Sequence, residues 1–342
     1  MNSWPRVKLR KICDVNPASH TVLGTSEVTF LSMSDVSADG RIVSPQIRHF
    51  SEVVIGFTQF QEGDVLVAKI TPCFENGKVA LAKNLKSLPI YLPPLPEQRK
   101  IADILMTWDE ALERLDALIH GKERQKKALM QQLLTGKTRM KGFSHLPWIK
   151  IRMSYLLTRV FRPIEWHPDL PLSLVSLRRR FGGLFRRPDV LGSEYKTQDL
   201  HELKTDDFLI SKRQVVHGAW AFVTSEFEET HVSKEYAILI NSAPDRLYMP
   251  FFGWLAQTPR MLRIARVSST GVHIEKLIFD PDVFLKESIR VPESIEEQRA
   301  IAATLDTADN ELILLRAQRI AIDQQKRGLM QRLLTGKVRV TV

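Results

Sequence analysis

The sequence predicts an α+β protein in which two globular domains of mixed strands and helices are joined by two long helices pairing as an antiparallel coiled coil. Three observations favour this arrangement. One helical segment occurs twice, each copy carries the apolar spacing of a coiled coil, and short strand-like segments precede each copy. The 342 residues suit two modest domains with connecting helices better than one compact core.

The internal repeat is the clearest feature of the chain. The tripeptide EQR at positions 97–99 recurs at 297–299, and the pentapeptide LLTGK at 133–137 recurs at 333–337. Both recurrences are offset by 200 residues (297 − 97), so no gap interrupts the two copies. About half of the positions from Glu97 to Lys137 are identical in the second copy, which chance does not produce.

Each copy is predicted to be one long helix with a coiled-coil seam. Its apolar residues step by four and then by three, which is the spacing of a helix that pairs with another helix. Lys126 and Lys326 fall on the seam, where a lysine can fix the register at a cost in stability. The seam residues are Ile101, Leu105, Trp108, Leu112, Leu115, Ile119, Leu129 and Leu133, then Ile301, Leu305, Ala308, Leu312, Leu315, Ile322, Leu329 and Leu333.

The predicted helix ends are marked by proline and glycine. Prolines at positions 93, 94 and 96 precede the first helix, where they disturb no helical hydrogen bond, and Gly136 and Gly336 stand where each helix should stop. The alternative is that each helix buries its apolar stripe on its own globular domain. The regular spacing and the length favour the coiled coil.

The segments ahead of the two helices also match, more faintly. Trp4 and Trp148 each open an alternating stretch, at 7–9 and at 149–151. Alternation and β-branched residues predict strands here, and also in the related stretches 63–69 and 206–212. Short strands broken by glycine, proline and asparagine indicate a mixed α+β domain.

The first copy lacks a long stretch that the second copy holds. Asp64 corresponds to Asp207 with an offset of 143 (207 − 64), whereas Leu85 corresponds to Leu285 with an offset of 200 (285 − 85). The deficit is therefore 57 residues (200 − 143) and falls between Lys69 and Leu85. The matching part of the second copy contains a predicted amphipathic segment, 248–262, and a basic polar stretch, 263–276.

Charge and cysteine content restrict the class of protein. Lys and Arg number 49 against 39 acids, for a net charge of +10, which favours a nucleic-acid partner over a basic surface kept for solubility. The two cysteines, Cys13 and Cys73, form no metal-binding spacing, which argues against a zinc site and for a reducing compartment. No signal peptide or membrane-spanning stretch is present, so we expect a cytoplasmic protein.

Motifs for catalysis are not evident. GKT at 136–138 resembles part of a phosphate-binding loop, but Gln131 stands where that loop needs glycine, so a helix cap explains it better. We find no glycine-rich methyl-donor loop, no Asn-Pro-Pro-aromatic site and no nuclease-like set of acids with a lysine. A nuclease acting alone is an alternative that only the basic charge motivates.

Three motifs together resemble the specificity subunit of type I restriction–modification enzymes. They are LPPLPEQRKIA at 92–102, LMQQLLTGK at 129–137 and AKITPCFENGK at 68–78, and the resemblance extends over essentially the whole chain. It implies a non-catalytic subunit with two target recognition domains, each reading one half of a split DNA site, and two helices that pair as a spacer. It also implies two methyltransferase subunits and motor–nuclease subunits as partners, which would bring S-adenosylmethionine, ATP and magnesium.

The resemblance predicts four parts: a truncated first recognition domain at 1–92, a first spacer helix at 93–140, a second recognition domain at 145–292 and a second spacer helix at 293–342. The chain departs from the family pattern in its shortened first domain, and more mildly in VPESIE at 291–296. The shortened domain motivates an alternative function, a recognition-defective assembly protein or gene remnant that recruits methyltransferase subunits through its helices.

The candidate DNA contacts are basic, hydroxyl and amide residues. Arg and Gln can make two hydrogen bonds to a base edge, whereas Lys, Ser and Thr commonly hold phosphates. Arginines at 178–180 and 186–187 are equally well explained as solvated charge. The candidates in the second domain are Lys212, Arg213, Gln214, Arg260, Arg263, Arg266, Ser268, Ser269, Thr270 and His273, and the weaker ones in the first domain are Lys69, Thr71, Asn76 and Lys78.

Overall fold

The computed structural model describes residues 4–14, 27–32, 35, 42–53, 59–60, 64–65 and 89–341. The chain divides into two compact units, one of residues 1–111 with 322–342 and one of residues 112–321. Helices α3 (Leu95–Leu133) and α7 (Ile295–Leu334) each contribute one part to each unit. The domain boundaries predicted from the sequence follow the repeat rather than this division, so they stay a prediction.

The first unit contains short strands beside the helix ends. Within the described residues of this unit, β1 pairs with β4 and β2 with β3, both antiparallel. Trp4, Ile101 and Leu333 form its buried core with partly buried neighbours from both long helices. The elements are β1 (Arg6–Lys8), η1 (Leu9–Lys11), β2 (Glu27–Phe30), β3 (Gln46–His49), α1 (Phe50–Val53) and β4 (Pro89–Tyr91).

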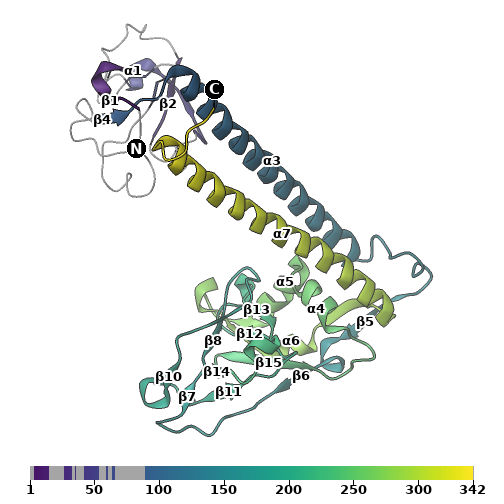
Figure 1. Ribbon diagram of the computed structural model, residues 1–342. Coiled ribbons are helices and arrows are strands. Elements are labelled where there is room, and N and C mark those ends of the chain that lie inside the picture. Colours follow the sequence, from purple (N-terminus) through teal and green to yellow (C-terminus); the bar gives the residue numbers. More distant parts are fainter. Residues whose placement is uncertain are drawn as a thin grey trace. The chain divides into compact units, whose positions relative to one another are not determined.

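Within each unit the two long helices lie side by side and run antiparallel (Figure 1). In the first unit Lys326 pairs with Asp109 at 2.5 Å, and in the second Lys126 pairs with Asp309 at 2.5 Å. Along α3 from Asp109 to Lys126, the residue numbers of the partners on α7 fall from 326 to 309. Only antiparallel helices give this order. The predicted antiparallel pairing is confirmed.

The helix pairing buries the predicted seam. None of the sixteen predicted seam residues is exposed, and the leucines at 112 and 312 are 4% and 2% exposed. The two seam lysines, Lys126 and Lys326, are half-buried. Each reaches an aspartate across the seam, so the charges that interrupt the apolar stripe meet opposite charges on the facing helix. The polar pairs thereby fix the register of the apolar ones.

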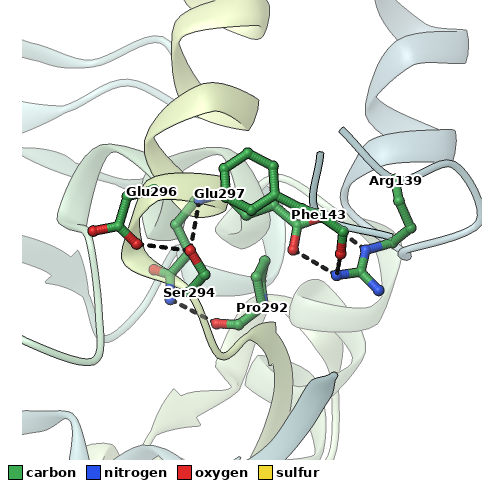
Figure 2. A network of polar contacts seen from close by, with 7 residues as sticks. Arg139, Phe143, Pro292, Ser294, Glu296 and Glu297 are labelled. Atoms are coloured by element: carbon green, nitrogen blue, oxygen red, sulfur yellow. Dashed lines mark hydrogen bonds and ion pairs between the residues drawn. The ribbon is translucent and has the colours of Figure 1, made fainter. Parts of the chain in front are cut away.

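In each unit, a bidentate ion pair joins the start of one long helix to the segment that follows the other. Glu297, fully buried at the start of α7, accepts two hydrogen bonds of 2.7 Å from Arg139, which follows the end of α3 (Figure 2). In the first unit Glu97 accepts bonds of 2.6 and 2.7 Å from Arg339. The two pairs are equivalent under the offset of 200 residues (297 − 97 and 339 − 139). Hydrogen bonding from Arg339 lowers the pKa of the Glu97 carboxyl.

The glutamine of the EQR motif holds the chain ahead of each helix. Gln98 donates to the carbonyl of Pro93 at 2.8 Å, and the fully buried Gln298 donates to the carbonyl of Pro292 at 2.9 Å. In the second unit Gln298 also accepts from the backbone of Tyr248 at 2.8 Å. The motif recurs because the same polar groups must be satisfied at the start of each helix.

The second unit is a mixed α+β domain (Figure 1). Its short 3₁₀ turns are η4 (Met153–Tyr155), η5 (Gly192–Glu194), η6 (Val215–His217), η7 (Ser225–Phe227) and η8 (Ile274–Lys276). Its strands and helices are β5 (Trp148–Arg152), β6 (Leu157–Val160), β7 (Pro171–Leu172), β8 (Val175–Leu177), β9 (Leu184–Arg186), β10 (Val190–Leu191), β11 (Leu200–Glu202), β12 (Phe208–Ser211), β13 (Trp220–Phe222), β14 (His231–Ser233), β15 (Tyr236–Asn241), α4 (Met249–Ala256), α5 (Pro259–Val267), β16 (Ser269–Thr270), β17 (Ile278–Phe279), α6 (Pro281–Lys286) and β18 (Ser288–Pro292).

A four-stranded antiparallel sheet, in the order β13-β12-β15-β6, organises this domain. Strand β12 is buried along its whole length. Because side chains alternate along a strand, Phe208 and Ile210 join the core under α4 and α5, whereas Leu209 joins a second core on the other face. The predicted single amphipathic segment at 248–262 forms two helices instead, since Pro259 begins α5 at a new turn capped by Thr258.

The two long helices end at Leu133 and Leu334, shortly before the predicted glycines. Gly136 and Gly336 have φ values of +70° and +67°, in the left-handed region that glycine adopts without strain. At Gly136 a second constraint applies, because a Cβ would lie 3.1 Å from the ring of Trp148. The glycine therefore turns the chain and admits the tryptophan that opens the second copy.

We predict that the Lys326–Asp109 pair contributes to the register of the helix pair. Lys326→Asp or Asp109→Lys should each lower the free energy of unfolding by about 0.5 to 1 kcal/mol, because like charges then face each other. The double variant should recover most of that loss. Thermal unfolding of the three variants measures the coupling, and additive losses in the double variant would contradict it.

We further predict that Gly136→Ala destabilises the protein by about 1 kcal/mol or more, since alanine at positive φ is strained and meets Trp148. Gly121→Ala is the matched control. Gly121 lies inside α3 with nothing within 4 Å of the added Cβ, so alanine should stabilise there by about 0.5 to 1 kcal/mol. Melting temperatures that shift in the same direction for both variants would refute the conformational role of Gly136.

Candidate nucleic-acid interface

Lys212, Arg213 and Gln214 directly follow the buried strand β12, as the sequence predicts. Backbone hydrogen bonds hold Lys212 on both sides, from its N–H to the carbonyl of Glu235 at 2.9 Å and from the N–H of Phe279 to its carbonyl at 2.9 Å. Three consecutive polar side chains therefore emerge from the end of a rigid central strand.

A buried ion pair fixes the start of the same strand. The Asp207 carboxylate is 1% exposed and accepts hydrogen bonds of 2.5 and 2.9 Å from the guanidinium of Arg162. It also accepts from the backbone N–H of Lys204 at 2.8 Å. The hydrogen bonds to Asp207 raise the pKa of Arg162, so this pair stays charged. Strand β12 is thus anchored at both ends.

The three candidates after β12 have different environments. Lys212 donates from Nζ to the carbonyl oxygen of Lys234 at 2.6 Å, and burial, followed by the charge of Arg159, lowers its pKa. Arg213 is exposed and pairs with Glu235 at 2.5 Å. Gln214 is half-buried, and its Oε1 has no hydrogen-bond partner among the described residues. This oxygen is buried, so a contact with a ligand requires the Gln214 side chain to turn outward.

The structure brings a second group of candidates beside the first. Strands β16 and β17 form a hairpin, and the bond from Phe279 to Lys212 ties that hairpin to the end of β12. Thr270 and His273 are exposed on the hairpin. The hydroxyl of Ser269 donates to Ala265 at 2.7 Å, and Ser268 is only 2% exposed. Ser268 lies at the buried junction of α5 and the hairpin, so we leave it out of the proposed contact set.

The three candidate arginines of α5, Arg260, Arg263 and Arg266, are all exposed. Their spacing of three residues places them along one side of the helix. The helix itself packs on η6, which follows Gln214. These arginines are therefore available to solvent on a helix that packs beside the end of β12. The first-domain candidates, Lys69, Thr71, Asn76 and Lys78, lie outside the described residues.

A cavity of about 260 Å³ opens beside Arg213 and Gln214. Its lining includes Arg187, which the sequence left open between phosphate contact and solvated charge, and two residues that sequence reasoning did not single out, Tyr195 and His231. The Nδ1 atom of His231 is buried and, like Oε1 of Gln214, has no partner among the residues described. Uncommitted polar atoms at a cavity wall can form hydrogen bonds to a ligand or to water.

A second cavity, of about 250 Å³, is lined by Lys212. Its lining includes Arg159, Phe161, His201 and Lys234, none of which the sequence reasoning had proposed. The sequence contained one signal for this cavity. Arg159 and Phe161 are two residues apart at the end of β6, and side chains at that spacing point to the same face of a strand. The guanidinium of Arg159 lies 4.3 Å from the centroid of the Phe161 ring.

No group of three or more histidines, cysteines, aspartates or glutamates able to hold a metal ion occurs in the part of the chain that the structure describes. In that part, no helix combines the length and the apolar character needed to cross a membrane. The site that the described residues form is a basic surface with two small cavities, each lined by apolar as well as basic side chains.

Fold and site together define a class: a repeated protein with paired helices and a basic α+β domain. Comparisons with known proteins are more specific. Residues 73–119 match the family model described as type I restriction modification DNA specificity domain. The specificity subunit of the type I restriction enzyme EcoEI from Escherichia coli is 38% identical over 85 residues, which cover 24% of this chain and 14% of that protein.

A second relative covers more of the chain. The putative type I restriction enzyme MjaX specificity subunit from Methanocaldococcus jannaschii is 26% identical over 274 residues, which cover 75% of this chain and 60% of that protein. These matches confirm the resemblance found in the sequence: the chain is similar to type I specificity subunits. It spans only part of the length of these relatives, from about a seventh for EcoEI to three fifths for MjaX.

A solved structure shares the fold. A chain from a study of complex assembly and conformational transition of the type I R-M system superposes with a TM-score of 0.55, at 16% identity and with 98% of each chain covered. This likeness agrees with the α+β architecture and long helices expected from the sequence.

The histidines of the two cavities predict how stability depends on pH. Burial is the main cause that lowers the pKa of His231 and of His201 below the ordinary value of 6.5. Both are therefore neutral in the folded protein, and unfolding below pH 6.5 takes up protons. Their contribution to stability is complete above that pH and is lost as the pH falls towards their folded-state pKa values.

We therefore expect His231→Gln to lose less stability between neutral pH and about pH 5.5 than the unaltered protein does. Chemical unfolding across that range measures it. His145→Gln, at an exposed position, is the matched control and should keep the pH dependence of the unaltered protein. Parallel stability curves for all three proteins would show that burial of His231 does not govern this effect.

Proposed function

We propose that this chain is the DNA-recognising specificity subunit of a type I restriction–modification system and is not itself an enzyme. It directs two methyltransferase subunits, and motor–nuclease subunits for cleavage, to a bipartite site on double-stranded DNA. Those partners supply S-adenosylmethionine, ATP and magnesium, and the complex works in the cytoplasm. The net charge of +10 supports a polyanionic partner.

The observation that carries this proposal is the equivalence of the two helix-closing ion pairs. Exchanging the two copies turns Glu97 with Arg339 into Glu297 with Arg139, and Lys126 with Asp309 into Lys326 with Asp109. A chain that repeats its frame in this way suits a DNA site read as two halves, because the symmetry of a protein and the arrangement of half-sites correspond.

Base reading in the second half is assigned to the surface around the end of β12. Gln214 offers an amide that can make two hydrogen bonds to adenine, and exposed Arg213 can make two to guanine. Thr270, His273 and the arginines of α5 extend that surface, with phosphate contacts as their main role. The anchoring of β12 at both ends supports the rigidity that base discrimination requires.

A specific observation favours a second candidate function, a recognition-defective assembly protein. The segment of the second copy that corresponds to the deficit holds β13, β15, α4 and α5, which build the core of that domain. The first copy is 57 residues shorter there (200 − 143). Such a chain would recruit methyltransferase subunits through its helices while one half-site goes unread.

A methylation map separates the two. The chain is co-expressed with the type I methyltransferase subunit of the same source in a methylation-free host, and modified adenines are located by sequencing. A split motif with two defined halves supports the working subunit. One defined half supports the assembly protein, and a stable complex that modifies no defined sequence contradicts specific recognition.

We predict that Gln214→Ala relaxes one base position in one half of the methylated motif. Loss of a bidentate contact costs about 1 to 3 kcal/mol of discrimination at that position. Gln198→Ala, an exposed glutamine that lines neither cavity, is the matched control and should leave the motif unchanged. An unaltered motif with Gln214→Ala would remove this residue from the base-reading set.

A further inference from the structure

The cavity lined by Lys212 brings together three cationic side chains and a histidine from four separate segments. Arg159 comes from β6, His201 from β11, Lys212 from the end of β12, and Lys234 from the turn before β15. Side chains so distant in sequence meet only because β12 and β6 both pair with β15. Gathering like charges around one cavity is unfavourable unless an anion occupies it.

The acids nearby offset this charge only in part. Asp199 pairs with Lys234 at 2.6 Å and Asp282 with Arg159 at 3.3 Å, and both carboxylates are more than half exposed. The third cation, Lys212, donates to a backbone carbonyl rather than to a carboxylate. Its pKa is lowered by burial and next by the charge of Arg159, which agrees with an ammonium held beside other cations.

His201 adds a neutral hydrogen-bond donor to the three cations. Its Nδ1 accepts a hydrogen bond of 3.2 Å from the backbone N–H of Arg162, so the ring proton is assigned to Nε2. Burial is the main cause that lowers the pKa of His201, which keeps this tautomer neutral. A neutral N–H donor among ammonium and guanidinium groups suits the oxygens of a phosphate.

An exposed aromatic ring completes the lining. Phe161 is 62% exposed, and Arg159 stacks over its ring at 4.3 Å. A large apolar side chain held in water beside cations indicates a ligand that is itself part apolar and part anionic. A nucleotide of DNA has this combination, because an apolar deoxyribose adjoins each phosphate.

We propose that this cavity binds a backbone phosphate of the DNA, through Arg159, His201, Lys212 and Lys234, while Phe161 packs on the adjoining deoxyribose. The proposal rests on the proposed DNA-binding function and adds a contact that reads no sequence. The end of β12 then separates two roles, with Lys212 on the backbone and Gln214 on a base edge.

The test uses the full chain in complex with its methyltransferase subunits. Binding of two fluorescent duplexes, one with the methylated motif and one scrambled, is measured by anisotropy over a series of salt concentrations. Lys212→Met should weaken binding to both duplexes by a similar factor, about tenfold or less. The slope of log K against log salt should become less steep by about 0.9, because one phosphate contact is lost.

Two further variants sharpen the result. Phe161 is exposed, so Phe161→Ala removes no core contact. This variant should weaken binding to both duplexes about threefold with the salt slope unchanged, since an apolar contact releases no counterion. Lys150→Met is the matched control, an exposed lysine that lines neither cavity, and should keep the slope of the unaltered complex.

If Lys212→Met leaves both the affinity and the salt slope unchanged, the proposed phosphate site is wrong. If this variant weakens binding to the specific duplex alone, Lys212 contacts a base instead. Calorimetry with deoxyadenosine monophosphate tests the alternative that the cavity binds a free nucleotide. Saturable binding that Lys212→Met abolishes would support that alternative. If the unaltered complex binds both duplexes equally and Lys212→Met still makes the salt slope less steep, the proposed sequence specificity is contradicted while the phosphate site is supported.

Discussion

Glu97 and Glu297 are carboxylates removed from water, and each takes its cation from an arginine that follows the end of the other long helix. A buried carboxylate without such a partner would be strongly unfavourable, so each arginine must arrive at a defined place. Within each unit, the carboxylate at the start of one long helix therefore fixes where the segment after the other long helix must lie. The apolar seam and the lysine–aspartate pairs then have only one register available.

The repeat and the helix pair could be predicted because their signals are local. Identity at a constant offset and a period of four and three residues are both legible without knowledge of a partner. The arginines at 139 and 339 share the same offset, yet their role went unrecognised. Each lies beyond a helix-ending glycine, and Glu297 is 158 positions away from Arg139. Only the antiparallel pairing brings these groups together.

Less of the candidate site could be predicted, because most of its residues come together only through long-range pairing. Lys212 and Gln214 follow a strand that its apolar residues reveal, whereas the cavity beside Lys212 is built from strands far apart in the chain. Ser268 is the opposite case, a predicted contact residue that the structure buries. Its sequence neighbourhood is polar, but packing at the start of the hairpin buries it. Burial of a hydroxyl depends on tertiary contacts that no short sequence window contains.

The pairing of β5 with β18 has a consequence for how such a chain can change. Trp148 faces Pro292 across this pair, and Glu293 donates to the carbonyl of Pro147 at 3.2 Å. The segment 148–292 thus leaves the long helices and returns to them at neighbouring points. Another segment that begins and ends with strands in this register can replace it without lengthening or shortening either helix. A change in this segment is therefore separable from a change in the helix pair.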